Sequence, residues 1–533
     1  MSKILVIGTG PLYSPEIKVF CGQSLRTWHV AKTLRDAGHA VDLIVMQTDG
    51  HAPDGEVAGQ IAHARYEGLN YGIIHTWEPD AVLGVLQQAH DSSDYDCIVA
   101  VNVNAAAIAA RLRTHLPMWC DLMGHMMGEA QAKCGVERSN ELLLHFWSRQ
   151  RRALRRADKV SVSAHKQMYA VLGELGVLGR LGFENAAHPF CAVVPIAADP
   201  MFLDLDLPVA TKRFRGDLFP EESFTVLWTG GYNTWTDVET LAAALSLAME
   251  QVPRMRFVST GGAIPGHNES TYPQFQDLMR RSGYIDRCHF LGWVEGEEIP
   301  PLYAECDLGL NIDGLNYETL LGGRNRLVNM MAAGLPVLTT LGTELSEIIC
   351  DNRLGYTVHI GKVQEFADAL IRASKISPER RQLGQRGRSY VKEHFSPEAV
   401  MRPLLKWAAA PFMAPDNEAK LRRAGENVRA LGEIASNPLE EEALALENGL
   451  LYENEHLRRE VERLQSELLQ LRGSRFYKVR RTVQQFKRAV APVKKAPSAE
   501  QTPGAISNDS GAMQRSNDLA VSPGQPGETE ETS

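Results

Sequence analysis

The chain has 533 residues, of which 44% are hydrophobic and 23% are charged, and its formal net charge is -9. This length exceeds what one hydrophobic core supports, so several domains are expected. The acidic balance argues against a general nucleic-acid-binding protein, and we expect no nucleic-acid partner.

The cysteines and the N-terminal residues bear on the cellular compartment. Eight cysteines are scattered along the chain without a Cys-x-x-Cys pair, a pattern typical of free thiols in a reducing cytosol. The first residues, "MSKILVIGTG", predict a strand and not a cleavable signal peptide. No apolar run approaches the roughly 20 residues that cross a bilayer. We therefore predict a cytoplasmic protein.

Strands and helices alternate through the first part of the chain. "KILVIGTG" predicts a strand, "QSLRTWHVAKTLRDAG" an amphipathic helix and "HAVDLIVM" another strand, and the alternation continues through "DCIVAVN", "AAAIAARLR", "MWCDLMG" and "ADKVSVSA". This order indicates a parallel sheet covered on both faces. We predict a Rossmann-like domain over residues 1–205. Gly8 and Gly10 match only part of a dinucleotide fingerprint, since Tyr13 replaces the third glycine.

The pattern pauses and then restarts with "FTVLWTGGYNTWTDVETLAAAL", "RMRFVSTGG", "CHFLGWV", "CDLGLNI" and "GLPVLTT". A second Rossmann-like domain with closing helices is therefore predicted over residues 206–412. The predicted fold class is α/β, with two doubly wound domains facing a cleft.

Residues 413–472 predict a helical linker and a short coiled coil. Leu450, Leu457, Leu464 and Leu471 recur every seven residues, with Asn454, Val461 and Leu468 at the other seam position. An Asn in a seam commonly fixes a two-stranded register. A homodimer through residues 439–471 is predicted, and a single solvated helix is the alternative.

Residues 473–495 predict a basic amphipathic helix. Its apolar positions are Phe476, Val479, Val483, Phe486 and Val490, and no acid lies between Gly473 and Lys495. Such a helix is typical of binding to an anionic membrane surface, and docking within the chain is the alternative. Residues 496–533 are rich in Ser, Pro, Gly and acids and are predicted to be disordered.

Ligands of doubly wound sheets bind at the carboxyl ends of the strands. Gly230 and Gly231 directly follow a predicted strand in "WTGGYNTWTD", which also contains Asn233, and "STGGAIPG" places Gly261 after the next strand. Glycines there allow close approach of the backbone to a ligand. A tight turn without a ligand is the alternative.

A further apolar helix is preceded by Gly322 and Gly323 and carries Arg324 and Arg326 at its start. Two cations beside the positive end of a helix dipole are unfavourable unless an anion is bound. Because guanidinium groups form paired hydrogen bonds to phosphate oxygens, a diphosphate is the predicted ligand. Glu318 is the nearby acid and suits sugar hydroxyls. The alternative is that Arg324 pairs with Glu318 only to fix the loop.

With these segments in this order, the chain resembles bacterial glycosyltransferases of the GT-B fold, especially the large retaining group that uses nucleotide sugars. The resemblance covers roughly residues 3–411. It depends on "GQSLRTWHVAKTLRDAGHAV", "WCDLMGHMMGEAQAK", "LWTGGYNTWTDVETL", "FLGWVEGEEIPPLYAECDLGLN" and "RNRLVNMMAAGLPVLTTLGTELSEII".

The sequence also departs from this family. The two glutamates of the family correspond here to Leu321 and Asn329, and the cations of its first second-domain loop are replaced by Gly231 and Thr236. Arg324 and Arg326 could replace those cations, and Glu318 one of the acids. The resemblance implies a donor site containing Gly230, Gly231, Asn233, Gly261, Trp293, Val294, Gly323, Arg324, Arg326 and Asn329.

The resemblance implies sugar transfer without a metal or other cofactor, with the leaving phosphate accepting the proton if configuration is retained. An inverting reaction would need a general base, for which Asp121 and then His125 are the candidates. The alternative for either residue is an ordinary capping or hydrogen-bonding role. The predicted catalytic residues are thus Asp121, His125, Glu318 and Arg324. The predicted acceptor-side residues are Gly22, Arg26, Asn102 and Asp121.

The resulting hypothesis is a glycosyltransferase that acts on a polysaccharide or lipid-linked acceptor in cell-surface glycan synthesis, peripheral on the inner face of the membrane. A nucleotide-sugar 2-epimerase-like enzyme shares this fold. A non-catalytic scaffold that assembles partners through the coiled coil is the third alternative, favoured by the absent glutamates.

Overall fold

The computed structural model describes residues 1–12, 21–47, 61–76, 78–205, 213–264, 268–424, 461 and 463–465. The chain divides into two units, Met1–Asn454 and Glu455–Ser533, and both sheets belong to the first. The predicted amphipathic helix (473–495) and tail (496–533) lie outside the described residues. So does the predicted coiled coil, apart from residues 461 and 463–465. Among the described residues, no helix is long and apolar enough to span a membrane.

The first sheet has eight strands in the order β3-β4-β2-β1-β5-β6-β7-β8. They are β1 (Lys3–Thr9), β2 (Ala40–Met46), β3 (Ile61–Tyr66), β4 (Leu69–Ile74), β5 (Cys97–Val101), β6 (Met118–Leu122), β7 (Lys159–Val162) and β8 (Cys191–Val193). All neighbours pair in parallel except β3 and β4. That pair is a hairpin whose turn, Glu67 (φ 43°) and Gly68 (φ 81°), has the left-handed backbone of a tight two-residue connection.

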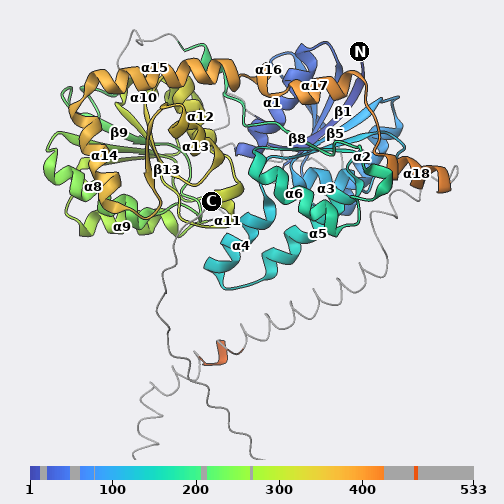
Figure 1. Ribbon diagram of the computed structural model, residues 1–533, viewed down its shortest axis with the longest axis horizontal. Coiled ribbons are helices and arrows are strands. Elements are labelled where there is room, and N and C mark those ends of the chain that lie inside the picture. The colour runs from blue at the N-terminus through green and yellow to red at the C-terminus, as the bar shows by residue number, and fades with distance from the viewer. Residues whose placement is uncertain are drawn as a thin grey trace, which may run out of the picture. The chain divides into compact units, whose positions relative to one another are not determined.

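Helices connect these strands and cover both faces of the sheet (Figure 1). They are α1 (Gly22–Asp36), α2 (Pro79–Asp91), α3 (Val103–Ala109), α4 (Met126–Glu137), α5 (Glu141–Arg156), α6 (His165–Val177) and the short η1 (Phe183–Asn185). Because both faces are covered, the central strands β1 and β5 are buried along almost their whole length.

The second sheet has six parallel strands in the order β11-β10-β9-β12-β13-β14. They are β9 (Phe224–Trp228), β10 (Met255–Thr260), β11 (Cys288–Gly292), β12 (Leu308–Asn311), β13 (Val337–Leu341) and β14 (Tyr356–His359). The helices are α8 (Val238–Gln251), α9 (Thr271–Arg281), η2 (Ile285–Arg287), η3 (Gly296–Glu298), α10 (Ile299–Glu305), α11 (Tyr317–Leu321), α12 (Asn325–Ala332), α13 (Glu344–Asp351), α14 (Val363–Lys375) and α15 (Ser377–His394). The predicted fold class, two doubly wound α/β domains, is confirmed.

The chain returns to the first domain after α15, through α16 (Pro397–Val400), α17 (Arg402–Ala409) and α18 (Pro415–Ala424). Trp407 of α17 packs against Trp119 of β6 with ring centroids 5.5 Å apart. Asp416 of α18 forms a buried ion pair with Arg180, 2.6 Å between Nη2 and Oδ1. These helices therefore pack on the first domain although the chain reaches them from the second. The domain limits at residues 205 and 412 remain predictions.

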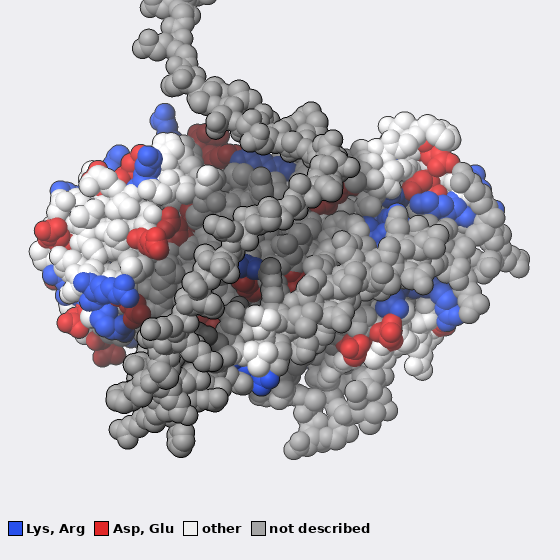
Figure 2. All heavy atoms as spheres, turned by 90° about the horizontal axis from the view of Figure 1, so that it is seen from below, with Lys and Arg blue, Asp and Glu red and all other residues white. Residues whose placement is uncertain are grey.

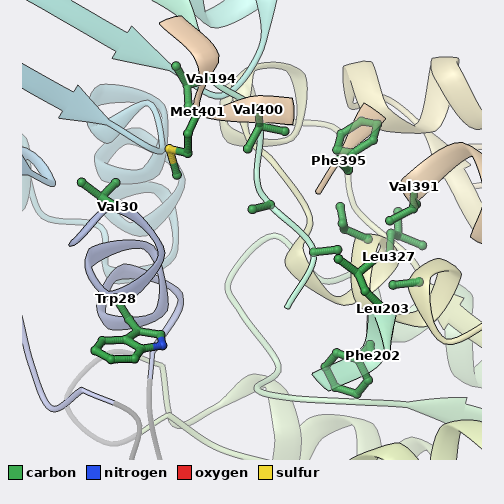
Figure 3. Packing of buried hydrophobic residues seen from close by; sticks show 14 of the residues in the cluster. Trp28, Val30, Val194, Phe202, Leu203, Leu327, Val391, Phe395, Val400 and Met401 are labelled. Carbon is green, nitrogen blue, oxygen red and sulfur yellow. The ribbon is translucent and has the colours of Figure 1, made fainter. Parts of the chain in front are cut away.

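One apolar cluster links the two domains. It contains Trp28 and Val194 of the first domain, Leu327 of the second, and Met401 from the returning segment. Figure 3 shows Met401 beside Val194, and Leu203 of α7 (Pro200–Leu203) beside Leu327. Because this cluster is continuous, the carboxyl ends of the two sheets are held near each other.

We predict that Trp407→Ala destabilises the first domain, because it removes a large buried side chain from the contact with Trp119. Trp407 is 3% exposed, and truncating such a residue costs about 3–5 kcal/mol of unfolding free energy. Urea unfolding measures this loss. The control is Trp147→Ala, where the side chain is 38% exposed and we expect a smaller loss. Equal losses in the two variants would contradict the packing described here.

Candidate active site

A buried charge triad occupies the loop between β12 and α12. Nε of Arg324 donates to both carboxylate oxygens of Asp313, at 3.1 and 3.0 Å. Its Nη1 and Nη2 donate to the two oxygens of Glu318, at 3.0 and 2.8 Å. All three side chains are buried. One guanidinium therefore holds the end of β12 and the helix α11 together immediately before α12 begins.

The pKa values of the triad follow from burial and pairing. Burial alone would lower the pKa of Arg324, but Asp313 and Glu318 together raise it above its ordinary value. Burial raises the pKa of Glu318 to about 6, since the nearby Arg324 offsets only part of the cost of desolvation. Arg324 is thus charged at every relevant pH, whereas Glu318 takes up a proton in mildly acidic solution.

Arg326, two residues further along, has a different environment. Its Nη2 donates to the backbone oxygen of Gly231 at 2.9 Å, and its guanidinium lies 3.8 Å from the ring centroid of Trp228. Among the described residues no carboxylate pairs with Arg326, and its Nη1 is buried without a hydrogen-bond partner. Burial lowers the pKa of Arg326 to about 10, so the side chain remains a cation at neutral pH with an unused donor.

Three glycine-containing loops meet at the carboxyl ends of β9, β10 and β11. Gly230 and Gly261 have positive φ angles of 84° and 76°. A Cβ on Gly261 would lie 2.3 Å from the backbone oxygen of Gly230, so only glycine permits this approach. The amide of Gly261 donates to the backbone oxygen of Gly292 at 2.6 Å. Gly231, the partner of Arg326, belongs to the first of these loops.

The remaining predicted donor-side residues border these loops or the first domain. Trp293, after β11, donates from Nε1 to the backbone oxygen of Ala263 at 3.3 Å. Val294 and Asn233 are half-buried in the loops after β11 and β9. Gly323 and Asn329 instead contact the segment that joins the domains. A Cβ on Gly323 would lie 2.4 Å from Ile196 Cδ1, and Oδ1 of Asn329 accepts from the Asp199 amide at 3.1 Å.

The N-termini of α1 and α12 approach each other between the domains. A Cβ on Gly22, the first residue of α1, would lie 2.8 Å from Nδ2 of Asn325, the first residue of α12. The first amides of each helix have no partner within the helix. The positive ends of the α1 and α12 dipoles therefore lie in the same region as the cation of Arg326. An anion bound there would be stabilised by all three.

A second buried ion pair lies at the carboxyl end of β6. Arg26 of α1 donates from Nε and Nη2 to the two oxygens of Asp121, at 3.1 and 2.8 Å, and from Nη1 to the backbone oxygen of Pro195 at 2.8 Å. The hydroxyl of Ser161 also donates to Asp121, at 2.6 Å. Asp121 is 1% exposed. This pair joins α1 to the sheet and to the segment that leads out of the first domain.

His125 and Asn102 also have structural contacts. Nδ1 of His125 accepts from the Gly128 amide at 3.0 Å and so caps α4, while Nε2 lies 3.1 Å from Glu174 Oε1. Asn102 precedes α3 with a φ of 76° and donates from Nδ2 to the backbone oxygen of Gln23 at 3.2 Å. Asn102 therefore supports the first turn of α1.

Comparisons with known proteins identify the two domains. The family described as "Glycosyl transferase 4-like domain" matches residues 22–178, and the family "Glycosyl transferases group 1" matches residues 223–375. The chain is a glycosyltransferase of the GT-B fold. A comparison with curated proteins finds no match.

Solved structures of low sequence identity share the fold of this glycosyltransferase. Sucrose-phosphate synthase from Thermosynechococcus elongatus is 19% identical with a TM-score of 0.61, and HepE from Anabaena in complex with UDP and glucose is 17% identical with a TM-score of 0.56. WaaG, a glycosyltransferase involved in lipopolysaccharide biosynthesis, is 16% identical with a TM-score of 0.52. Each alignment covers 76% or 77% of this chain and 100% of the other.

In the structure of the glycosyltransferase, Arg324 and the two general-base candidates have the contacts that the sequence left open as alternatives. Arg324 is not an unpaired cation, since Glu318 and Asp313 occupy its guanidinium. The alternative, pairing of Arg324 with Glu318, is what the structure has. Asp313 was not predicted, although an acid two residues after the end of the buried strand β12 was a signal for it.

The two candidates for a general base have hydrogen-bonding roles. Asp121 is buried and accepts hydrogen bonds from Arg26 and Ser161. Both ring nitrogens of His125 are also occupied. Neither side chain is therefore free to take a proton from an acceptor hydroxyl in this arrangement. Besides Asp313, sequence reasoning missed Asn325, which meets Gly22.

A cluster of metal-binding side chains is not found among the described residues. No group of three or more His, Cys, Asp or Glu side chains in that part of the chain could hold a metal ion. Figure 2 shows described Lys and Arg side chains interspersed with Asp and Glu on the face that it draws.

Substituting Arg324 and Arg326 one at a time by glutamine tests which of the two side chains stabilises the fold. We expect Arg324→Gln to lower the free energy of unfolding by about 3–5 kcal/mol, because it leaves two buried carboxylates without their partner. The matched variant Arg326→Gln leaves no carboxylate unpaired and should stay within about 1 kcal/mol of the wild type. Urea unfolding without ligand measures both. The assignment is wrong if Arg326→Gln is the more damaging change.

The raised pKa of Glu318 predicts a pH dependence of stability. Between its ordinary value of 4.5 and about 6, the folded state binds more protons at Glu318 than the unfolded state does. Protonation of Glu318 therefore contributes to the free energy of unfolding, and this contribution is fully present below pH 4.5 and is lost as the pH rises through about 6. The difference between these pKa values corresponds to about 2 kcal/mol.

The variant Glu318→Gln removes this titration. Unfolding free energies measured for wild type and variant from pH 4 to 7 should show the wild type losing about 2 kcal/mol relative to the variant as the pH rises. A difference between the two proteins that stays constant over this range would show that Glu318 does not titrate there.

Proposed function

We propose that this glycosyltransferase transfers a sugar from a nucleoside diphosphate sugar, with Arg326 binding the diphosphate. The observation that carries the proposal is the half-buried guanidinium of Arg326, which has no carboxylate partner among the described residues and whose Nη1 has no hydrogen-bond partner. The nearest carboxylate, Asp313, is already paired with Arg324 and offsets only part of the cost of burying Arg326, so that an anionic ligand would stabilise this cation further. Phosphate oxygens are the acceptors that a guanidinium fits best.

The helix ends support the same position for the diphosphate. Asn325 begins α12 and Gly22 begins α1, and the two residues meet between the domains. Positive charge from Arg326 and both helix N-termini would stabilise the phosphate charge that develops when the bond to the sugar breaks. We propose on this basis that transfer needs no metal. The glycine loops at Gly230 and Gly261, with Trp293 and Val294, are proposed to hold the remainder of the donor.

The contacts of the predicted acceptor-side residues agree better with a retaining reaction than with an inverting one. An inverting reaction needs a general base, but Asp121 and His125 are both occupied by other contacts. In a retaining reaction the leaving phosphate can itself take the proton from the acceptor hydroxyl. We therefore propose retention of configuration, with the roles of Arg26, Asn102 and Asp121 restricted to holding α1 and its neighbouring segment in place.

We also propose that the acceptor is a polysaccharide or lipid-linked glycan at the inner face of the membrane. Two observations support this proposal. Residues 473–495 have a basic amphipathic pattern, and the fold is similar to that of WaaG, which is involved in lipopolysaccharide biosynthesis. The homodimer through residues 439–471 stays a prediction. A scaffold without activity is distinguished from an enzyme by the binding experiment that follows.

Thermal unfolding with UDP, GDP, ADP and their glucose conjugates tests the donor class. A ligand at one hundred times its Kd stabilises the folded state by about 2.7 kcal/mol, so one nucleotide series should raise the Tm of the wild type. Arg326→Gln should bind that ligand about tenfold or more weakly, because a charge-assisted hydrogen bond contributes about 1.5–3 kcal/mol.

The control is Arg372→Gln, which changes an exposed arginine of the same domain that pairs with Glu379. This variant should respond to the ligand as the wild type does. Equal stabilisation of wild type and Arg326→Gln would remove Arg326 from the diphosphate site. If none of the nucleotides raises the Tm, the proposed nucleoside diphosphate sugar is not the donor. A non-catalytic scaffold is then the better hypothesis.

A further inference from the structure

Charged side chains connect the two domains at the N-termini of α6 and α13. Glu344 of α13 lies with Oε1 2.8 Å from Nδ1 of His165, and its Oε2 accepts from the Lys166 amide at 3.2 Å. Nζ of Lys166 also donates to Glu347 Oε1 at 2.5 Å. We call these four residues the latch. His165 and Lys166 belong to the first domain, and Glu344 and Glu347 to the second.

The latch supplies a helix cap that α6 does not have in its own sequence. The residue before α6 is Ala164, which has no side-chain acceptor for the first amides of the helix. Glu344 provides this acceptor from the other domain, and its negative charge lies at the positive end of the α6 dipole. Its own helix does not need it as a cap, because Thr343 accepts from the Ser346 amide at 3.1 Å.

The latch lies beside the loop that carries the charge triad. Glu344 lines a small cavity of about 40 Å³ together with Ser163 and Gly322 to Arg324. On the same loop, Gly323 packs against Ile196 of the first domain. Contacts that bring α6 against α13 therefore also seat the start of α12 against the first domain, where Gly22 meets Asn325.

We propose that Glu344 is a positioning residue and that the latch holds the two domains in the arrangement in which α1 and α12 face each other. The inference depends on the proposed function only in that this arrangement is the one in which transfer occurs. Lys166 and Glu347 are partly exposed, at 34% and 48%. Exposed pairs are weak, so the latch can open and close again as substrates enter and products leave.

Energy transfer between two dyes tests the latch without any ligand. One dye is attached through Gln88→Cys in α2 of the first domain and the other through Glu250→Cys in α8 of the second, both at exposed positions. The exposed native cysteines, Cys21 and Cys350, are replaced by serine. The measurement uses the full chain and reports the ratio of closed to open molecules.

We expect Glu344→Gln to lower the ratio of closed to open molecules about fivefold, because the helix end loses its counter-charge. Lys166→Glu places like charges across the interface and should lower the ratio about tenfold. Combining Lys166→Glu with Glu347→Lys restores an opposite pair and should recover most of that loss. The Tm should change little in all three variants.

The control exchanges charges within one domain. Asp277 and Arg280 of α9 form an exposed pair inside the second domain, and Asp277→Lys with Arg280→Glu should leave the dye distance unchanged. The proposal is overturned if Lys166→Glu keeps the wild-type distance, or if the double exchange fails to recover it. Because no nucleotide is used, failure of the latch is distinguishable from failure of the donor assignment.

Discussion

The bidentate pairing of one buried guanidinium with two carboxylates is the constraint on which the site depends. Arg324 joins Asp313 at the end of β12 to Glu318 of α11, and α12 begins with the next residue. Buried charges persist only when they are paired and hydrogen-bonded. This requirement fixes the loop before α12, and through it the direction in which the helix presents its first amides and Arg326.

The two arginines illustrate how position decides the role of a side chain. Arg324 is the N-cap residue of α12, and its side chain pairs with two acids. Arg326 is the second residue of the helix, and its side chain contacts Trp228 and Gly231 instead. Neutralising the first cation within the protein leaves the second as the charge that a ligand can compensate. The site thus keeps a stable loop and an available cation within three residues.

Much of the fold could be predicted from the sequence, because strand and helix periodicities alternate clearly and repeat in both domains. The hairpin of β3 and β4 could not, since β3 has no buried position and lacks an apolar run, and only Glu67 and Gly68 mark the turn. At the site, the glycine loops were predictable because Gly230 and Gly261 directly follow buried strands.

The pairing of Arg324 with Asp313 was not predictable, since it depends on how the chain after β12 folds back. The occupation of Asp121 by Arg26 depends in the same way on residues far apart in the sequence, 95 positions in this case.

The position of the diphosphate in a crystal structure with the bound nucleotide tests the central claim most directly. The account predicts phosphate oxygens within about 2.7–3.1 Å of Arg326 Nη1, near the first amides of α12, with Asp313 and Glu318 still paired to Arg324. A structure in which Arg324 leaves its carboxylates to hold the phosphates, while Arg326 stays without contact to them, would contradict it.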